Sequence, residues 1–195
     1  MNILLDRLPD YVEADGRQYK IRTDFRVWIR FDLLISQGEL TPETLLEILK
    51  LCYALDRSHS IPQTAEKALN ALAGFYAGEK ISGGQGGSRA EKQNRIYSFS
   101  ADADYIYSAF MSQYNIRLNR VKYLHWWEFQ ALFQGLDESH KLSKIMEYRA
   151  VDLGKIKDKE QKRFYQKMKR LYALPDTRSQ AQKEADMLAA FSKII

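Results

Sequence analysis

The chain has 195 residues, which suffices for one domain of ordinary size and excludes two large ones. Hydrophobic residues make up 45% of the sequence and charged residues 28%, proportions that argue against wholesale disorder and against a fibrous repeat. The net charge of +5 is modest, and composition alone does not identify a function.

Cysteine content and hydropathy narrow the class of protein further. The single cysteine, Cys52, excludes an intramolecular disulfide and a cysteine-based zinc site, because each needs at least two. No run approaches the roughly 20 apolar residues of a membrane span, and the N-terminus lacks the basic and apolar regions of a signal peptide. We therefore expect a cytoplasmic protein without a membrane partner.

The N-terminal segment predicts a β-hairpin. Residues 11–14 and 17–21 flank Asp15-Gly16, a dipeptide that supplies the positive φ angles of a type I′ turn. No other part of the chain gives a convincing strand signal. The fold class is therefore expected to be mainly α, a compact helical domain with a short hairpin at its N-terminus.

A first helix is expected from Thr23, whose hydroxyl can cap it, to Gly38. Its apolar side chains cover nearly the whole circumference, which is typical of a heavily buried helix. Asp32 lies on this apolar surface. We expect it to be partly buried beside a basic partner rather than to be catalytic.

Two more helices are predicted before the middle of the chain. Thr41-Pro42 places a hydroxyl at the N-cap of one helix and proline at its first position. Ser60 and Pro62 open the other helix. Cys52 lies in the apolar pattern of the first of these two helices, and we interpret it as a small buried hydrophobe because no activating base accompanies it.

Residues 82–95 include a glycine- and serine-rich stretch that is typical of a flexible linker, here between two helical halves. The stretch GGQGGSR matches neither a P-loop nor a dinucleotide-binding fingerprint, since it lacks the Gly-Lys-Ser/Thr ending and follows a helical pattern. A loop that becomes ordered on binding is the alternative.

The second half is expected to begin with a helix capped by Ser100 and ended by Asn115. Asp102 and Asp104 fall in its first turn, where carboxylates favour the positive end of the helix dipole. This position explains both aspartates without a metal ion, because residues two apart point about 200° away from each other on a helix.

The densest aromatic cluster of the chain follows at residues 124–133, LHWWEFQALF. Apolar side chains surround this helix almost completely, so we predict a central core helix that ends at Gly135. His125 has no nucleophile or metal-ligand companion at useful spacing, and we interpret it as structural or hydrogen-bonding. The residues expected in the core are Trp28, Phe31, Tyr105, Phe110, Leu124, Trp126, Trp127, Phe129 and Leu132.

The excess positive charge is concentrated near the C-terminus. Residues 155–170 carry eight basic and two acidic side chains, a local charge of +6 that leaves −1 for the rest of the chain. Apolar residues recur here at helical spacing, so the segment is predicted to be an amphipathic helix that stops at Leu174-Pro175. These apolar residues are Phe164, Met168, Leu171 and Tyr172. The basic face is either simply solvated or attracts polyanions or acidic protein surfaces.

Residues 175–195 are predicted to form a C-terminal amphipathic helix that either completes the core or binds a partner. Residues 1–174 then form a single, mainly helical domain. We expect the C-terminal third to carry the interaction surface, and we predict no catalytic or metal-binding residue. The candidate binding residues are Lys155, Lys162, Arg163, Lys167, Met168, Arg170, Tyr172, Met187, Leu188, Phe191 and Ile194.

The order of these segments resembles the bacteriophage "gene product fifteen" family, found in tailed phages and prophages of low-GC Gram-positive bacteria, over residues 8–174. The segments that carry the resemblance are TDFRVWIRFD, YSFSADADYIYSAFMSQYNI, LHWWEFQALFQGL and IMEYRAVDL. The most specific piece is the tryptophan pair behind a histidine, Leu124-His125-Trp126-Trp127. The supporting pieces are Asp102 with Tyr105 and Phe110, and Tyr148-Arg149 with Asp152-Leu153.

The resemblance implies a role in tail morphogenesis, because the family lies in the tail region, typically close upstream of the tape-measure protein. It implies a tail assembly chaperone, many copies of which cover the exposed apolar stripes of the tape-measure protein and recruit tube subunits. The expected partners are the tape-measure protein, the tail tube protein and further copies of this chain, and no cofactor is expected. Such a factor acts in the host cytoplasm and is absent from the mature virion.

Three other functions stay open. A nucleic-acid-binding module is favoured by the isoelectric point near 9.1 and by aromatic residues among the basic ones, although no helix-turn-helix or β-platform motif is evident. A structural tail component of the virion is compatible with the same family. An enzyme is disfavoured, since the sequence has no nucleophile elbow, phosphate loop or His-Cys cluster.

Overall fold

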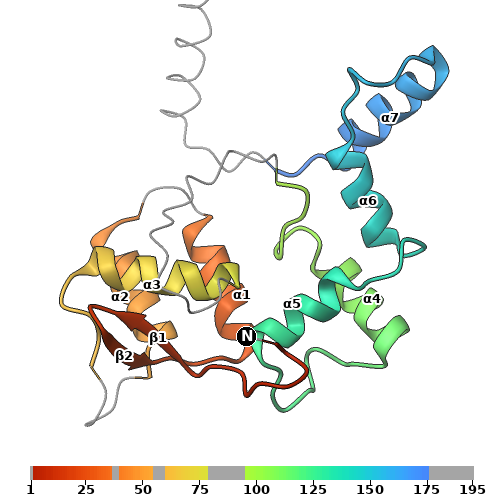
Figure 1. Cartoon of the computed structure of the whole chain (residues 1–195). Helices are drawn as coiled ribbons and strands as arrows, with labels where there is room; N and C mark the ends of the chain where they lie inside the picture. The colour runs from red at the N-terminus through yellow and green to blue at the C-terminus, as the bar shows by residue number, and fades with distance from the viewer. Residues whose placement is uncertain (1, 37–39, 55–59, 79–94, 176–195) are drawn as a thin grey trace, which may run out of the picture.

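The computed structural model describes residues 2–36, 40–54, 60–78 and 95–175. In these ranges the fold is mainly α, as predicted, with seven helices and a two-stranded antiparallel sheet at the N-terminus (Figure 1). The elements in chain order are β1 (Tyr11–Ala14), β2 (Arg17–Lys20), α1 (Phe25–Ile35), α2 (Pro42–Cys52), α3 (Ala65–Ala77), α4 (Ala103–Tyr114), α5 (Trp126–Gln134), α6 (Lys141–Ala150) and α7 (Lys159–Leu171).

The hairpin forms where the sequence predicts it. The turn residues Asp15 and Gly16 have φ angles of 54° and 68°, as a type I′ turn requires. Val12 and Tyr19 pair across the two strands, and both are buried. Since β1 packs against α3, this buried pair attaches the hairpin to the helices.

The residues after β2 fix the hairpin to the end of α2. β2 ends at Lys20, one residue before the predicted end, because Ile21 forms a separate bridge with Tyr53. The backbone N–H of Arg22 donates to the Cys52 carbonyl at 2.8 Å. The hairpin, α2 and α3 therefore pack as one unit.

Helix α2 starts at the predicted cap, Thr41, but α1 does not start at Thr23. Asp24 is the N-cap of α1, and its carboxylate accepts a hydrogen bond from the Arg26 N–H at 3.0 Å. The Thr23 hydroxyl instead bonds the Tyr123 hydroxyl at 2.7 Å, across 100 residues of sequence. A tertiary contact thus takes the hydroxyl that the local sequence offers as a cap.

Two later helices also start after their predicted caps. α3 is capped by Thr64 rather than by Ser60. The N-cap position of α4 is Asp102 rather than Ser100. Asn115 ends α4 as predicted, in the left-handed conformation (φ 54°) that asparagine tolerates better than most residues.

Helix α5 is central to the core, as predicted. The Phe129 ring stacks on Phe25 of α1 at 5.1 Å and on Phe110 of α4 at 5.0 Å, measured between ring centroids. The starts of α1 and α5 are joined by a backbone hydrogen bond from the Phe25 N–H to the Leu124 carbonyl (2.9 Å). One aromatic helix thereby connects the two halves of the sequence.

The residues predicted for the core are buried to different degrees. The fully enclosed members are Trp28, Phe31, Phe110, Trp126 and Phe129. The half-buried members, which pack against this cluster, are Tyr105, Leu124, Trp127 and Leu132. The indole N–H of Trp126 donates to the Tyr76 carbonyl at 2.9 Å and that of Trp127 to the Phe75 carbonyl at 2.8 Å. Both indole donors are therefore satisfied at the end of α3.

The last two helices form an arm beside the rest of the structure. Figure 1 shows α6 leading away from α4 and α5, with α7 at its outer end. α6 packs against α4 and α7 packs against α6. We call β1, β2 and α1–α5 the body, and α6–α7 the arm. Helix α7 differs from the six other helices because none of its residues is buried.

Several predictions concern residues outside the described ranges. They are most of the glycine-rich linker at 82–95 and the C-terminal helix at 175–195, whereas α1 ends at Ile35 with Ser36 as its C-cap, before the predicted stop at Gly38. The candidate binding residues in that last segment are Met187, Leu188, Phe191 and Ile194. The linker and the division of the chain at residue 174 stay predictions.

Candidate functional site

The predicted basic amphipathic segment forms α7. The helix begins at Lys159, four residues after the first basic residue Lys155, because the Asp158 carboxylate caps it by accepting from the Gln161 N–H at 2.7 Å. Glu160 lies in the first turn and two basic residues lie in the last turn, an order that suits the helix dipole.

One side of α7 rests on α6. Tyr148 of α6 stacks on the Tyr172 ring at 5.9 Å and meets the Phe164 ring edge-on at 6.0 Å, measured between ring centroids. The Tyr165 hydroxyl donates to Glu147 Oε1 at 3.0 Å. The apolar stripe therefore packs against another element on this side of the helix.

The other side of the apolar stripe is exposed. Phe164 keeps 49% and Leu171 64% of its surface accessible, although both side chains are large and apolar. Since a helix repeats every 3.6 residues, side chains seven positions apart lie about 20° from each other. Met168 and Tyr172 are half-buried, so the stripe is only partly covered by the described residues.

Basic side chains border the exposed apolar pair. Arg163, Lys167 and Arg170 are exposed on the flank beside this pair, whereas Lys162 is exposed on the opposite side of α7 and Lys155 precedes the helix. A hollow of about 690 Å³ opens between α7 and the segment after α6. Its lining residues are Leu153, Arg163, Gln166, Lys167, Lys169 and Arg170. Sequence reasoning did not select Lys169 as a binding residue, and its amine donates to the Val151 carbonyl at 2.8 Å. Of the candidate binding residues within the described ranges, α7 thus brings Arg163, Lys167 and Arg170 together around this hollow.

A buried ion pair anchors the arm to the body. Asp102 at the start of α4 is 1% exposed, and Arg149 of α6 is 9% exposed. Arg149 Nη1 donates to Asp102 Oδ2 at 2.6 Å, and Arg149 Nη2 donates to Asp102 Oδ1 at 2.9 Å. Two parallel hydrogen bonds between a guanidinium and a carboxylate are stronger and more directional than a simple charge pair.

Arg149 also binds two backbone carbonyls. Its Nη1 donates to the Ile96 carbonyl at 3.0 Å, and its Nε donates to the Tyr172 carbonyl after α7 at 2.6 Å. The explanation of Asp102 as a helix-dipole residue is therefore corrected, because its carboxylate is enclosed in this junction. Asp104 stays exposed in the first turn of α4. The pair was not predicted, since 47 residues separate its members in sequence.

A second buried carboxylate confirms a prediction. Asp32 is 3% exposed, and Arg95 is its basic partner. The Tyr76 hydroxyl donates to Asp32 Oδ1 at 2.6 Å. Burial, together with the nearby Asp32 charge, raises the pKa of Tyr76. The cluster fixes the segment before α4 against α1 and α3.

His125 and Cys52 have the structural roles that the sequence predicts. His125 Nδ1 accepts from the Trp127 N–H at 3.1 Å, so the neutral ring carries its proton on Nε2 and donates it to the Pro9 carbonyl at 3.1 Å. Burial lowers the pKa of His125. Cys52 is enclosed in the core, and burial raises the pKa of its thiol to about 12.

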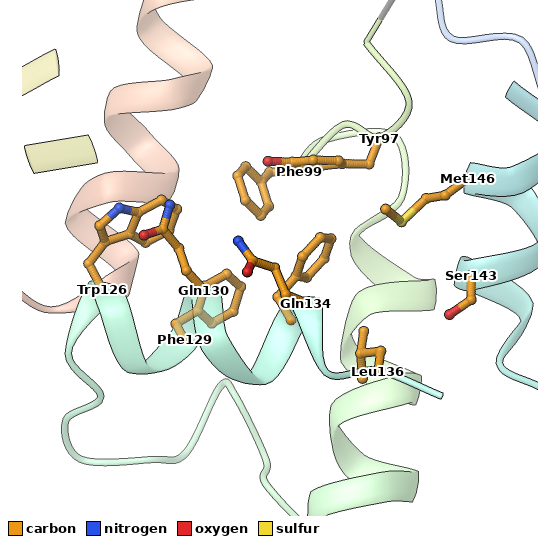
Figure 2. A pocket seen from close by; sticks show the side chains of 10 residues that line it. Tyr97, Phe99, Trp126, Phe129, Gln130, Gln134, Leu136, Ser143 and Met146 are labelled. Carbon is orange, nitrogen blue, oxygen red and sulfur yellow. The ribbon is translucent and has the colours of Figure 1, made fainter. Parts of the chain in front are cut away.

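An apolar hollow of about 390 Å³ lies between α5, α6 and the segment before α4 (Figure 2). Its lining residues are Tyr97, Phe99, Trp126, Phe129, Gln130, Phe133, Gln134, Leu136, Ser143 and Met146. The Gln130 amide donates to the Tyr76 carbonyl at 2.9 Å, and the Ser143 hydroxyl donates to the Asp137 carbonyl at 2.8 Å. Two polar groups of the lining are thus already engaged, so the hollow suits an apolar side chain better than a polar ligand.

The described ranges contain neither a metal-ligand cluster nor a membrane-spanning helix. No three His, Cys, Asp or Glu side chains gather there in a way that could hold a metal ion. Across the same residues, no helix combines the length and the apolar character that crossing a bilayer requires.

Comparison with known protein families assigns the chain. Residues 4–174 match the family described as Bacteriophage Gp15 protein. The chain belongs to this family. It is therefore a bacteriophage protein, and the resemblance inferred from the sequence segments is confirmed. No curated protein and no solved structure matches the chain.

The region that matches the Gp15 family includes both the body and the arm. Asp102 and Tyr148-Arg149 support the resemblance as separate pieces of sequence, and the structure joins them through the buried ion pair. Trp126 and Trp127, the most specific piece, anchor α5 to the end of α3. The segments that carry the resemblance therefore include residues that hold the helices together.

Proposed function

We propose that this Gp15-family protein is a tail assembly chaperone that binds the tape-measure protein in the host cytoplasm. It performs no bond-making chemistry and is absent from the mature virion. The observation that carries the proposal is the partly covered apolar stripe of α7, bordered by basic side chains, in a chain that belongs to a phage family.

The α7 stripe has the properties needed to bind a tape-measure protein. The resemblance implies a partner that is very long and largely helical, with apolar stripes that stay exposed until the tail tube polymerises around it. Phe164 and Leu171 offer apolar contact to such a stripe, and the basic residues beside them offer a charged rim that sets register. Many copies bound along one tape-measure chain would cover it and recruit the tail tube protein.

The proposal that the protein is not an enzyme is supported by the uses of its reactive side chains. His125 caps α5 with one ring nitrogen and binds the Pro9 carbonyl with the other. Cys52 is held as a thiol, because burial raises its pKa. Asp102 and Arg149 neutralise each other inside the structure. Each of these groups is engaged in holding the fold, which favours a recognition role over a catalytic one.

Co-expression with the tape-measure protein tests the proposal directly. The full chain should co-purify with a tape-measure protein that is insoluble alone, and size exclusion with light scattering should give several copies for each tape-measure chain. Mass spectrometry of mature particles should find no copy of the chain. Failure to recover a complex contradicts the proposal, and stoichiometric presence in particles identifies a structural tail component instead.

The C-terminal segment is part of the same proposal. Its candidate residues Met187, Leu188, Phe191 and Ile194 would extend the apolar surface beyond α7. Deleting residues 179–195 should leave a folded chain that no longer retains the tape-measure protein, as measured by co-purification. Unchanged recovery of the complex would remove this segment from the proposed surface.

A nucleic-acid-binding function is the second candidate. It is favoured by the hollow beside α7, where Arg163, Lys167 and Arg170 converge. Affinity for random duplex DNA that falls steeply with the logarithm of salt concentration would support it, because bound cations on DNA are released by basic side chains. No binding at low salt would exclude it.

A further inference from the structure

The exposed side of α7 presents apolar and basic side chains in two parallel rows. Phe164 and Leu171 form the apolar row. Arg163, Lys167 and Arg170 are spaced by four and then three positions, so they form a row along one flank of the same helix. Lys167 lies about 60° around the helix from Phe164. We call these five residues the α7 face.

The basic row has its charge available for a partner. In the part of the chain that the structure describes, the ion pairs are formed by Arg26, Lys67, Arg95 and Arg149, and not by any member of the row. All three members are exposed and line the hollow beside α7. Lys169, which lines the same hollow, is instead bound to the Val151 carbonyl. The row is therefore a strip of three exposed cations beside an apolar row that the described residues leave partly exposed.

We propose that the α7 face binds an acidic amphipathic α-helix of the tape-measure protein. Apolar residues of that helix contact Phe164 and Leu171, and its carboxylates, spaced by three and four positions, meet Arg163, Lys167 and Arg170. This inference rests on the proposed function for the identity of the partner. It adds that acidic segments are selected over neutral and basic ones.

The apolar row decides between a protein and a nucleic acid as the partner. A duplex offers phosphates that a basic strip can neutralise without apolar contact. An acidic helix offers both carboxylates and an apolar stripe, so it uses Phe164 and Leu171 as well as the cations. Phe164 is 49% and Leu171 64% exposed. When an acidic helix covers them, the burial of apolar surface adds a favourable contribution to the binding free energy, which a phosphate backbone cannot supply.

Designed peptides of about 21 residues test this selectivity on the full-length protein. One peptide carries leucine at the apolar positions of each heptad and glutamate elsewhere. The second replaces glutamate with lysine, and the third keeps glutamate but replaces leucine with glutamine. In fluorescence anisotropy, the Leu/Glu peptide should bind at least about tenfold more tightly than either control, and more tightly at about 50 mM than at about 300 mM salt. Equal affinity for all three, or tighter binding of a duplex DNA, overturns the inference.

Two variants with the same change of charge locate the contact on the helix. Lys167→Glu reverses a cation of the α7 face, whereas Lys162→Glu reverses a cation about 160° from Phe164, on the opposite side. Lys167→Glu should lower the affinity for the Leu/Glu peptide about tenfold, and Lys162→Glu should lower it less than about twofold. Leu171→Ser, at an exposed site, should also weaken the peptide without lowering the melting temperature. Equal losses for both lysines would show attraction by net charge alone and contradict the proposal.

The same variants separate this inference from the proposed function. If the wild-type chain co-purifies with the tape-measure protein and Lys167→Glu does so equally well at all salt concentrations, the chaperone function stands and the acidic-helix inference fails. If the Leu/Glu peptide binds as expected but no tape-measure complex forms, the α7 face does select acidic amphipathic helices. The tape-measure protein is then the wrong partner.

Discussion

The body and the arm both contain aromatic side chains on amphipathic helices, yet they use them differently. In the body, Phe129 stacks between Phe25 and Phe110 and is 1% exposed. In the arm, Phe164 touches Tyr148 with one edge and stays 49% exposed. An amphipathic pattern therefore predicts that a helix face needs apolar contact, but not whether the same chain supplies it. The uncovered face in the arm is where we place recognition.

The largest expected effect comes from the same substitution made in both regions. Phe129→Ala should lower the free energy of unfolding by about 3–5 kcal/mol, because it leaves a cavity among stacked rings. Phe164→Ala should lower it by less than about 1 kcal/mol, since half of that side chain is already in water. Urea denaturation of both variants measures the difference. Similar losses would show that α7 is part of the core and contradict the division into body and arm.

The junction between the two regions should be nearly as sensitive. Asp102→Ala leaves Arg149 charged and unpaired in a buried site, which should lower the free energy of unfolding by about 3 kcal/mol. The double substitution Asp102→Leu with Arg149→Met should lower the free energy of unfolding by less than Asp102→Leu alone and Arg149→Met alone do in sum. The reason is that neither charge is then left unpaired in the buried site. A double-mutant cycle in urea measures this coupling. Strictly additive losses would mean that the pair does not anchor the arm.

Protonation of His125 gives a smaller effect that is confined to the body. Burial lowers its pKa below the unfolded value of 6.5, so the unfolded chain binds the proton first as the pH falls. The stability that the neutral ring contributes is complete above the unfolded pKa and is lost as the pH falls from there toward the folded pKa. Between about pH 7.5 and about pH 5.5, the wild type should lose more stability than His125→Asn, whose amide can still cap α5. Urea denaturation at the two pH values measures these losses. Equal losses of unfolding free energy in the wild type and in His125→Asn would contradict this role of His125.

The smallest perturbation uses the thiol of Cys52 as a reporter of opening in the body. Burial raises its pKa to about 12, so almost no thiolate exists near pH 8 in the folded chain. An aromatic disulfide reagent should label the native protein very slowly and the urea-unfolded protein completely. Binding of a partner to the arm should leave the native rate unchanged. Rapid labelling of the native chain would show that the body opens readily at α2.

Local signals predicted the elements correctly where nothing distant competes for their side chains. Asp15-Gly16 gives the hairpin turn and Thr41 the start of α2, because both depend only on neighbouring backbone. Thr23 failed as a cap since its hydroxyl is bound by Tyr123, far away in sequence. Cap choice among adjacent polar residues is therefore decided by tertiary contacts, which a single sequence does not contain.

The candidate site could be located but not resolved from the sequence. Charge and periodicity identified α7 and most of its basic residues, because both are properties of one segment. Neither property indicates which side of the stripe α6 covers, so the exposure of Phe164 and Leu171 needed the structure. The Asp102–Arg149 pair needed it too, since two charges 47 residues apart carry no local signal of contact.

The most direct test of the account is hydrogen exchange on the full-length protein, free and in complex with the tape-measure protein, read peptide by peptide. Recognition through the arm predicts slower backbone exchange at residues 159–172 in the complex, with α1 and α5 unchanged. Slower exchange confined to α1–α5, with α7 exchanging as in the free protein, would contradict the claim that the arm is the recognition surface.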